Sequence, residues 1–382
     1  MAKIGILTST PSFNDNYGAV LQAYALQQCL RQCGHEPCDL VYRGSNETVP
    51  SSKKASPLAR FKGIFLSSGT FSHSLGVIKS KRGRAERERV FKRFQREHLS
   101  LSADVYDYSG LQGIVDEYDA FICGSDQVWN PRVHGGVNDP GYFLQFACGK
   151  ARTVAYAPSF GVSSLPDACR ENLGIYVGRI DHVSVREDSG AALLADAGVS
   201  APVVVDPTML LSSDDYDEIA VRPDWLPERY LAVYKFGERG EYDRRIKETA
   251  RRLGLPVVNI PAAVDPIFRT RWGIGPSEFL AIVRDAELVC TDSFHATVFS
   301  ILYRTSCIVF PRDVPGSKKS MNSRMEGLLD RLGMKSCYVS DCADWDEAMS
   351  AAQDYAEAHR RLSAWRAESD DFLVRSLQGV GE

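Results

Sequence analysis

The 382-residue sequence predicts an α/β protein made of two Rossmann-like domains that face each other across a cleft. Short strand-like apolar runs alternate with amphipathic helical patterns, which is the pattern of parallel sheets with crossover helices. An acidic, proline-containing stretch at residues 212–228 interrupts this series once, and the series then starts again. At about 150 residues per domain, the length also favours two domains over one.

The first domain is expected over residues 1–211. It opens with a strand at Lys3–Thr8, a polar loop to residue 16 and a helix at Tyr17–Cys33, which Gly34 ends. This strand–loop–helix opening is typical of a Rossmann-like domain. Further strands are expected, each with a polar or Gly/Pro corner after it, at Pro37–Tyr42, Ala120–Cys123, Thr153–Ala157, His182–Arg186 and Val203–Val205.

The second domain is expected over residues 229–342, followed by a helical segment at 343–382. Its predicted strands lie at Tyr230–Phe236, Val257–Ile260, Leu288–Cys290 and Ser306–Phe310. The aromatic residues Trp345, Tyr355 and Trp365 in the last segment predict that it packs back on the body of the protein.

The composition is that of an ordinary globular protein, with 44% hydrophobic residues, 25% charged residues and a net charge of -4. This charge gives no reason to expect a nucleic-acid partner. The N-terminus lacks the apolar core of a signal peptide and no run is long enough for a membrane span, so we expect a cytoplasmic protein. The ten scattered cysteines are then expected to be reduced thiols. Cys33, His35 and Cys38 lack a second ligand pair at zinc spacing, and we expect no metal site.

One basic segment, residues 45–96, interrupts the first domain. Its second part, Lys79–Arg96, is a highly charged helical pattern in which basic residues outnumber acidic ones. Two interpretations fit this segment. It is a solvated helix preceded by a loop, or it is a basic, partly apolar surface that contacts the inner face of an anionic membrane or a lipid-phosphate acceptor.

The segment TDSFHATVFSI at residues 291–301 is the strongest candidate for a functional corner. A strand-like run leads into it and an apolar helical pattern follows, so His295 lies where a strand meets a helix. Ligands of open α/β sheets bind at this edge, backbone N–H groups of a helix N-terminus favour an anion, and histidine transfers protons near neutral pH. The alternative is a buried histidine that only caps the helix.

Two polar corners in the first domain are candidates for contact with a sugar. At residues 14–19, Asn16 either caps the following helix or contacts a ligand, and Gly18 leaves room for a ligand near the backbone. At residues 124–130, GSDQVWN follows a buried strand; Asp126 is suited to accept a proton from a sugar hydroxyl and Trp129 to stack on a pyranose face. The alternative for this second corner is a tight turn with Trp129 in the core.

Cationic residues follow two further strands. Arg186 carries a planar fork suited to a carboxylate or phosphate, although the adjacent Glu187 or Asp188 would also pair with it. The loop at residues 311–324 carries Arg312, Lys318 and Arg324, which are either solvated or close on an anionic ligand. The chain has neither GxGxxG after its first strand nor a Walker A motif, so neither familiar nucleotide site is supported.

Taken together, these stretches resemble the polysaccharide pyruvyl transferase family. The matching pieces run in the family's order from residue 4 to about 333, and they are ILTSTPSFNDNYGAVLQAYAL, FICGSDQVWNP, YAPSFG, SVREDSGAALLADAGV, VVDPTMLL, TDSFHATVFSI and MNSRMEGLLDRLG. The resemblance implies the two-domain GT-B architecture of glycosyltransferases. It also implies phosphoenolpyruvate as donor substrate, no further cofactor, and a pair of sugar hydroxyls on a free or lipid-linked glycan as acceptor. The products would be a pyruvate ketal and phosphate.

The resemblance also assigns site residues. The family's donor-binding arginine falls on Arg186 and its histidine on His295, while Ser293 and Phe294 stand where many members have Arg-Leu. One cation is therefore missing from this corner, and a loop cation is expected to replace it. The expected sets are His295 and Asp126 for catalysis; Arg186, Ser293, Arg312, Lys318 and Arg324 for the donor; and Asn16, Tyr17, Gly18, Ser125, Asp126, Gln127 and Trp129 for the acceptor.

Two other functions are compatible with the same predicted fold, because fold does not determine function. The first is a nucleotide-sugar-dependent glycosyltransferase of the GT-B type, which would need a base- and ribose-binding pocket in the second domain. The second is a non-catalytic sugar-binding or assembly subunit, against which the presence of both Arg186 and His295 argues.

Overall fold

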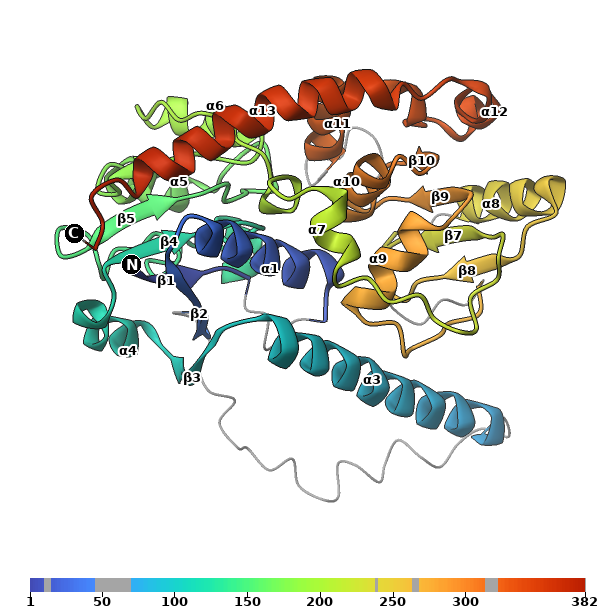
Figure 1. Ribbon diagram of the computed structural model, residues 1–382, viewed down its shortest axis with the longest axis horizontal. Helices are drawn as coiled ribbons and strands as arrows, with labels where there is room; N and C mark the ends of the chain where they lie inside the picture. Colours follow the sequence, from blue (N-terminus) through green and yellow to red (C-terminus); the bar gives the residue numbers. More distant parts are fainter. Residues whose placement is uncertain (10–14, 45–69, 238–239, 263–267, 313–321, 382) are drawn as a thin grey trace.

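A computed structural model describes residues 1–9, 15–44, 70–237, 240–262, 268–312 and 322–381 of the chain. Two parallel β-sheets lie side by side, one formed by the first half of the chain and one by the second (Figure 1). This is the mixed α/β, two-sheet fold that the sequence predicts. Lys318 and residues 45–69 of the basic segment lie outside the described residues.

The first sheet has six strands in the order β3-β2-β1-β4-β5-β6. The strands are β1 (Lys3–Leu7), β2 (Glu36–Tyr42), β3 (Leu101–Tyr106), β4 (Ala120–Cys123), β5 (Arg152–Ala155) and β6 (His182–Val183). Its helices are α1 (Tyr17–Gln32), α3 (Thr70–His98), α4 (Tyr108–Gly113), α5 (Asp167–Val177) and α6 (Asp188–Asp196). This is the strand order of a dinucleotide-binding Rossmann domain, in which the strand order reverses between β1 and β4.

The second sheet has four strands in the order β10-β9-β7-β8, and all its pairings are parallel. The strands are β7 (Leu231–Tyr234), β8 (Val257–Asn259), β9 (Leu288–Thr291) and β10 (Cys307–Val309). The helices are α8 (Gly240–Leu253), α9 (Pro276–Arg284), α10 (Phe294–Tyr303) and α11 (Asn322–Leu332), with the short α7 (Ser213–Asp217) before β7. Here the strand order reverses between β7 and β9.

The central strands are apolar along their whole length because helices cover both faces of each sheet. Every residue of β4 (AFIC), β7 (LAVY) and β9 (LVCT) is buried, as expected for strands of a parallel sheet. One continuous core cluster includes residues of both domains. At their junction, Tyr17 of α1 stacks on Phe279 of α9 with ring centroids 4.6 Å apart. The two domains therefore share a core.

The C-terminal helices return to the first domain. After α12 (Trp345–Ser350), the long helix α13 (Tyr355–Ser376) runs along one side of both domains (Figure 1). The Trp365 Nε1–H donates to the Val203 carbonyl at 2.9 Å, and Arg366 Nε donates to the Met209 carbonyl at 2.6 Å. The chain thus begins and ends in the first domain.

Helix α3, which contains the charged part of the basic segment, belongs to the first half of the chain and contacts α9 of the second domain. Its residues Val90, Phe91 and Phe94 are buried. The buried guanidinium of Arg87 donates to Asp15 Oδ2 at 2.7 Å and to the Tyr17 hydroxyl at 2.9 Å. Both interpretations place α3 at the surface, and one face of the helix is exposed there. Neither included the opposite face, whose apolar and cationic residues pack into the domain junction.

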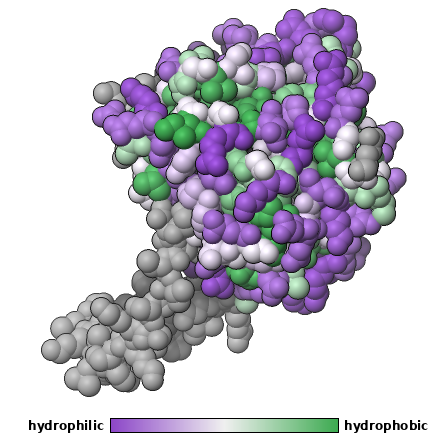
Figure 2. All heavy atoms as spheres, turned by 90° about the vertical axis from the view of Figure 1, so that its left-hand side faces the viewer, coloured by the Kyte–Doolittle hydropathy of each residue, from purple (hydrophilic) through white to green (hydrophobic). Residues whose placement is uncertain are grey.

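No helix among the described residues is long and apolar enough to cross a membrane. On the face of the molecule shown in Figure 2, hydrophilic residues dominate and hydrophobic residues occur in small separate groups. All ten cysteines are free. In the described part of the chain, no three His, Cys, Asp or Glu side chains are grouped as metal ligands.

Candidate active site

A buried carboxylate, Asp206, lies at the centre of the polar residues between the two sheets. It caps the 3-10 turn Pro207–Met209, where Oδ1 accepts hydrogen bonds from the Thr208 backbone N–H at 3.0 Å and hydroxyl at 2.7 Å. Its other oxygen, Oδ2, accepts from Arg186 Nη1 at 2.8 Å and from the Ser125 hydroxyl at 2.9 Å. From the second domain, His295 Nε2 approaches Oδ1 to 3.7 Å, which is an ion-pair distance and too long for a hydrogen bond.

The charge of Asp206 is strongly stabilised. Burial alone would raise the pKa of its carboxyl group, but the nearby His295 and Arg186, together with the Thr208 hydroxyl, lower that pKa well below the usual range. Asp206 is therefore ionised in the folded protein. It forms a fixed negative centre that orients residues from both domains.

Arg186 lies in the corner between β6 and α6 and is 4% exposed. Besides its bond to Asp206, its guanidinium lies over the Phe294 ring at 4.8 Å. Asp126 Oδ1 and Glu187 Oε2 are 3.6 and 3.8 Å away, so the adjacent Glu187 is not its main partner. The buried Nε and Nη2 of Arg186 make no hydrogen bond to any described residue. Buried donors without acceptors are costly and rare, and an anion is the acceptor that a guanidinium suits best.

Two further arginines flank this corner from the second domain. Arg324, on the first turn of α11, is 8% exposed. Burial and the nearby cation of Arg186 lower the pKa of Arg324 to about 10. Arg312, after β10, lies with its guanidinium over the Phe236 ring at 4.2 Å. Two of the three loop cations predicted from the sequence therefore lie beside the histidine corner.

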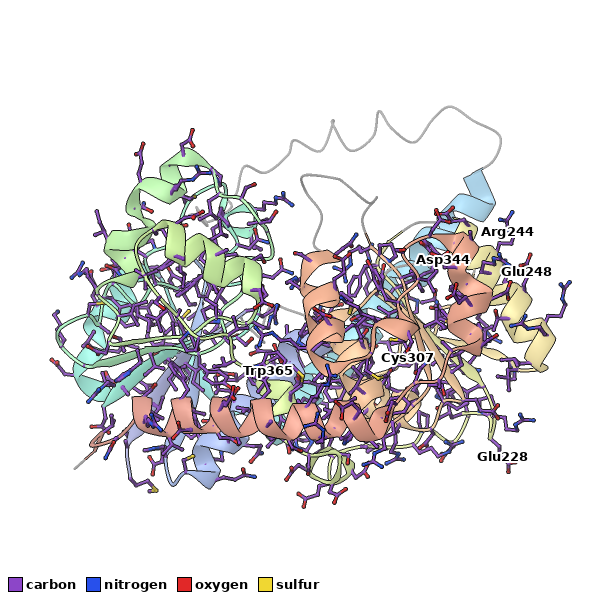
Figure 3. All side chains as sticks on the ribbon, turned by 90° about the horizontal axis from the view of Figure 1, so that it is seen from above. Glu228, Arg244, Glu248, Cys307, Asp344 and Trp365 are labelled. Atoms are coloured by element: carbon purple, nitrogen blue, oxygen red, sulfur yellow. The ribbon has the colours of Figure 1, made fainter. Side chains whose placement is uncertain are left out.

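Two pockets meet at this arginine cluster. The first lies between the domains and is lined by Arg186, Phe294, Arg324 and Trp365 among others. Trp365 extends from α13 toward the region between the domains (Figure 3). The second lies in the C-terminal domain, where Arg312, Asp292 and Tyr338 join Phe294 and Arg324. Arg324 and Phe294 thus form a wall common to both pockets.

His295 lies in the first turn of α10 and reaches across the domain junction. A Cβ atom placed on Gly18, at the start of α1, would lie 1.9 Å from His295 Nδ1. Gly18 is therefore needed for the close approach of this ring, and not for the approach of a ligand to the backbone. The imidazole is 8% exposed, and Nε2 forms no hydrogen bond within the described chain. His295 does not cap its own helix, because Ser293 accepts the hydrogen bond from the Ala296 N–H.

Several residues assigned to the acceptor or donor have structural roles instead. Trp129 is buried and stacks on Phe143 at 4.7 Å, so its face is not open to a pyranose. The Tyr17 hydroxyl donates to the Ile274 carbonyl inside the domain junction. The hydroxyls of Ser125 and Ser293 are engaged by Asp206 and by the α10 cap. These assignments are corrected, because each side chain is covered by its own neighbours.

Of the remaining residues of the two acceptor corners, some have structural roles and others lie beside the arginine cluster. Asn16 caps α1 by accepting from the Gly18 N–H at 2.9 Å, which is the capping role left open by the sequence. Asp126 lies in the left-handed region with φ 65°, and its carboxylate faces Arg186. The amide of Gln127 lies against Arg324, with its oxygen as acceptor at 3.2 Å. Only Asp126 and Gln127 of this set therefore border the arginine cluster.

Sequence reasoning missed two carboxylates of the site. Asp206 was visible only as part of a polar Asp-Pro-Thr corner after a strand. Glu187 was considered only as a partner of Arg186, but its Oε1 accepts from the Ser159 hydroxyl and from the Phe160 and Gly161 N–H groups. It therefore braces the corner that presents Arg186.

The sequence model described as Polysaccharide pyruvyl transferase matches residues 16–314. This range includes every strand of both sheets except β1, and all the site residues above except Arg324, Tyr338 and Trp365. The chain belongs to the polysaccharide pyruvyl transferase family. The expected resemblance is thereby confirmed for most of the chain. Curated proteins gave no match.

Solved structures with a related arrangement are distant from this pyruvyl transferase family member. One is a UDP-GlcNAc 2-epimerase from Methanocaldococcus jannaschii, with 10% identity, 92% of each chain covered and a TM-score of 0.48. Another is the UDP-GlcNAc 2-epimerase from Neisseria meningitidis bound to UDP-GlcNAc, with 8% identity, 99% coverage of each chain and a TM-score of 0.43. A glycosyltransferase from Streptomyces sp. SF2575 has 12% identity, 99% and 100% coverage and a TM-score of 0.42. We take no function from these structures.

Proposed function

We propose that this protein transfers pyruvate from phosphoenolpyruvate to a pair of sugar hydroxyls of a surface polysaccharide or its lipid-linked precursor, forming a pyruvate ketal and releasing phosphate. The observation that carries the proposal is the buried guanidinium of Arg186, whose Nε and Nη2 have no acceptor among the described residues. Arg324 lies beside it and lines the same pocket. Phosphoenolpyruvate carries a carboxylate and a phosphate on the same carbon, and two neighbouring guanidinium groups match such a pair of anionic groups.

The reacting groups follow from this placement. His295, when protonated, donates its proton to the methylene carbon of the enol, so that the neighbouring carbon becomes an oxocarbenium centre. One sugar hydroxyl attacks this centre and loses its proton to the carboxylate of Asp126. The bond between this carbon and the phosphate oxygen then breaks and phosphate leaves. The second hydroxyl attacks the same carbon, closes the ketal and gives its proton to His295, which restores the acid. A histidine acid contributes roughly 10²–10⁴-fold to the rate, while the arginines position the donor and stabilise the departing phosphate.

Asp206 supports both steps without contacting the substrate. Its two oxygens lie toward Arg186 and His295, at 2.8 and 3.7 Å. It keeps the donor-binding arginine in place, and it faces the histidine that reaches over from the second domain. Since Arg186 belongs to the first domain and His295 to the second, the proposed reaction requires both domains in this arrangement.

The test measures the binding of phosphoenolpyruvate by calorimetry or by thermal shift. Nucleoside diphosphates and nucleotide sugars serve as comparison ligands. Binding to the native state raises the melting temperature by mass action. We expect a saturable shift with phosphoenolpyruvate and at least a tenfold weaker affinity in Arg186→Lys, which keeps the charge beside Asp206 but loses the fork. Arg229→Ala removes an exposed cation paired with Glu287 and serves as control. No response of the wild type to phosphoenolpyruvate would reject the proposal.

Turnover is measured as phosphate release in the presence of candidate acceptors, such as galactosides, glucosides and mannosamine derivatives. Tight donor binding without turnover on any glycan would instead favour a non-catalytic subunit.

We further propose that the reaction takes place in the cytoplasm, at the inner face of the membrane, where the acceptor is lipid-linked. The support is the row of exposed basic residues on α3, including Arg84, Arg89 and Arg96. Anionic vesicles at low salt should retain the protein, and substitution of these three arginines by glutamine should abolish retention. Equal retention by neutral vesicles would contradict the electrostatic basis of this contact.

A further inference from the structure

A side-chain carboxylate of the protein lies at the point where the strand order of the second sheet reverses. In open α/β sheets, ligands bind in the crevice beyond the carboxyl ends of the strands at this point, here between β7 and β9. The backbone N–H groups of Phe236 and Gly237 follow β7 and face this crevice. The carboxylate of Asp292, the first residue after β9, accepts from the Phe236 N–H at 2.9 Å and from the Gly237 N–H at 2.7 Å.

Asp292 is held firmly in this position. It is 5% exposed. The preceding Thr291 hydroxyl donates to the Tyr234 carbonyl at 2.6 Å, which ties the end of β9 to the end of β7. Arg312 Nη2 lies 3.4 Å from the Asp292 carbonyl oxygen, with its guanidinium over the Phe236 ring. Two N–H groups therefore hold the carboxylate, and the Arg312 cation lies beside it, bonded to the backbone carbonyl of the same residue.

The two N–H groups, together with the neighbouring Arg312 cation, would form a phosphate cradle if the carboxylate were absent. Convergent backbone N–H groups beside a cation are the usual means by which α/β domains bind phosphate groups. Burial raises the pKa of Asp292, and Arg312 and the two N–H groups oppose this rise. A phosphate beside an ionised Asp292 would be repelled by its like charge.

We propose that Asp292 is a specificity-determining residue that occupies the phosphate position of the second domain and closes it to nucleoside diphosphates. The domain keeps the architecture of a nucleotide-binding unit but carries its own anion where a diphosphate would bind. This inference rests on the proposed function only in that the donor is not a nucleotide. It assigns to one side chain the choice between a phosphoenolpyruvate-dependent transferase and a nucleotide-sugar-dependent one.

The test removes the carboxylate and measures binding of UDP and of inorganic pyrophosphate. We expect no saturable response of the wild type at millimolar ligand. Asp292→Ala should bind both ligands at least tenfold more tightly than the wild type. Asp292→Asn keeps the side-chain volume and one acceptor oxygen, and should show a smaller gain. Asp346→Ala removes an exposed carboxylate on the same domain, where it pairs with Arg245 and Arg252, and should show no gain.

The outcomes separate this inference from the proposed function. Folded Asp292→Ala and Asp292→Asn proteins, as judged by circular dichroism and melting, that gain no affinity for either ligand would overturn the inference alone. A wild type that binds UDP as tightly as Asp292→Ala would overturn it as well. If that wild type also failed to respond to phosphoenolpyruvate, the proposed function would fall with it.

Discussion

Substituting Gly18 by alanine displaces the candidate catalytic histidine without touching the arginine cluster. The added Cβ would lie 1.9 Å from His295 Nδ1, 2.4 Å from Cγ and 2.5 Å from Cε1, whereas ordinary contact begins at 3.4 Å. The difference, 3.4 minus 1.9, requires the ring to retreat by 1.5 Å. The opposite side of the ring faces Asp206, so the imidazole has no free path of withdrawal within the described site.

Two effects on stability oppose each other in this variant. Overpacking of a closed site costs about 1–3 kcal/mol, while alanine is favoured over glycine inside a helix by up to about 1 kcal/mol. The net loss of stability should therefore be at most about 3 kcal/mol. A misplacement of about 1 Å lowers turnover by roughly 10²-fold, and we expect a loss of kcat of that size or larger. The affinity for phosphoenolpyruvate should change by only a few fold, because Arg186 and Arg324 are not touched.

The assay is phosphate release from phosphoenolpyruvate with a productive acceptor, combined with urea denaturation and calorimetric titration of the donor. Gly113→Ala is the matched control, because a Cβ at Gly113 would meet no atom within 4 Å. A folded Gly18→Ala protein with wild-type kcat would refute the assignment of His295 as the acid, since a displaced ring cannot deliver the proton to the same atom.

Three further variants test the polar network around Asp206, a buried carboxyl group in β2 and the domain junction. Asp206→Asn leaves Arg186 buried without its ion pair and should cost about 3–5 kcal/mol, seen as a loss of ~4–6 °C in melting temperature if all 382 residues melt together. Because the folded pKa of Asp206 is lowered, this difference from wild type should persist above pH ~3.9 and shrink as the pH falls below it. Burial raises the pKa of Asp39 to about 8. The free energy of unfolding of the wild type should therefore fall by up to ~1.4 kcal/mol per pH unit as the pH rises from ~4 to about 8. Asp39→Asn should remove this slope from a series of denaturation curves. Arg87→Met should lower the free energy of unfolding by about 1.5–3 kcal/mol, because a charged donor to two partners is lost; no change in the urea midpoint would show that α3 does not stabilise the junction.

Much of the fold follows from local patterns. The strands β4, β7 and β9 are continuous apolar runs bounded by polar corners, so their position can be predicted from the sequence, and alternation with helices predicts that they are parallel. Parallel strands end at one edge of a sheet, and this is why the corners containing Arg186 and His295 were candidates for a site before the family resemblance assigned them roles.

The contacts inside the site could not be predicted in the same way. Asp206 bonds to Ser125, which is 81 residues away in sequence, and no local pattern marks that pairing. Trp129 follows a polar corner as a sugar-binding aromatic would, but its stacking partner Phe143 comes from an irregular segment that a periodicity argument does not position. Tyr17 was assigned to the acceptor because it begins a helix at a candidate corner, and only the packing of α1 on α9 shows that its ring is enclosed.

Each of the two long helices, α3 and α13, packs on the half of the molecule to which it does not belong in sequence. Helix α3 belongs to the first half of the chain and packs on the second, where Arg93 pairs with Glu278 of α9, while α13 belongs to the second half and binds the first through Trp365 and Arg366. Each half of the chain thus contributes one helix that binds the other half. After a single cut in the segment at 212–228, we therefore expect the two halves to stay associated through these contacts.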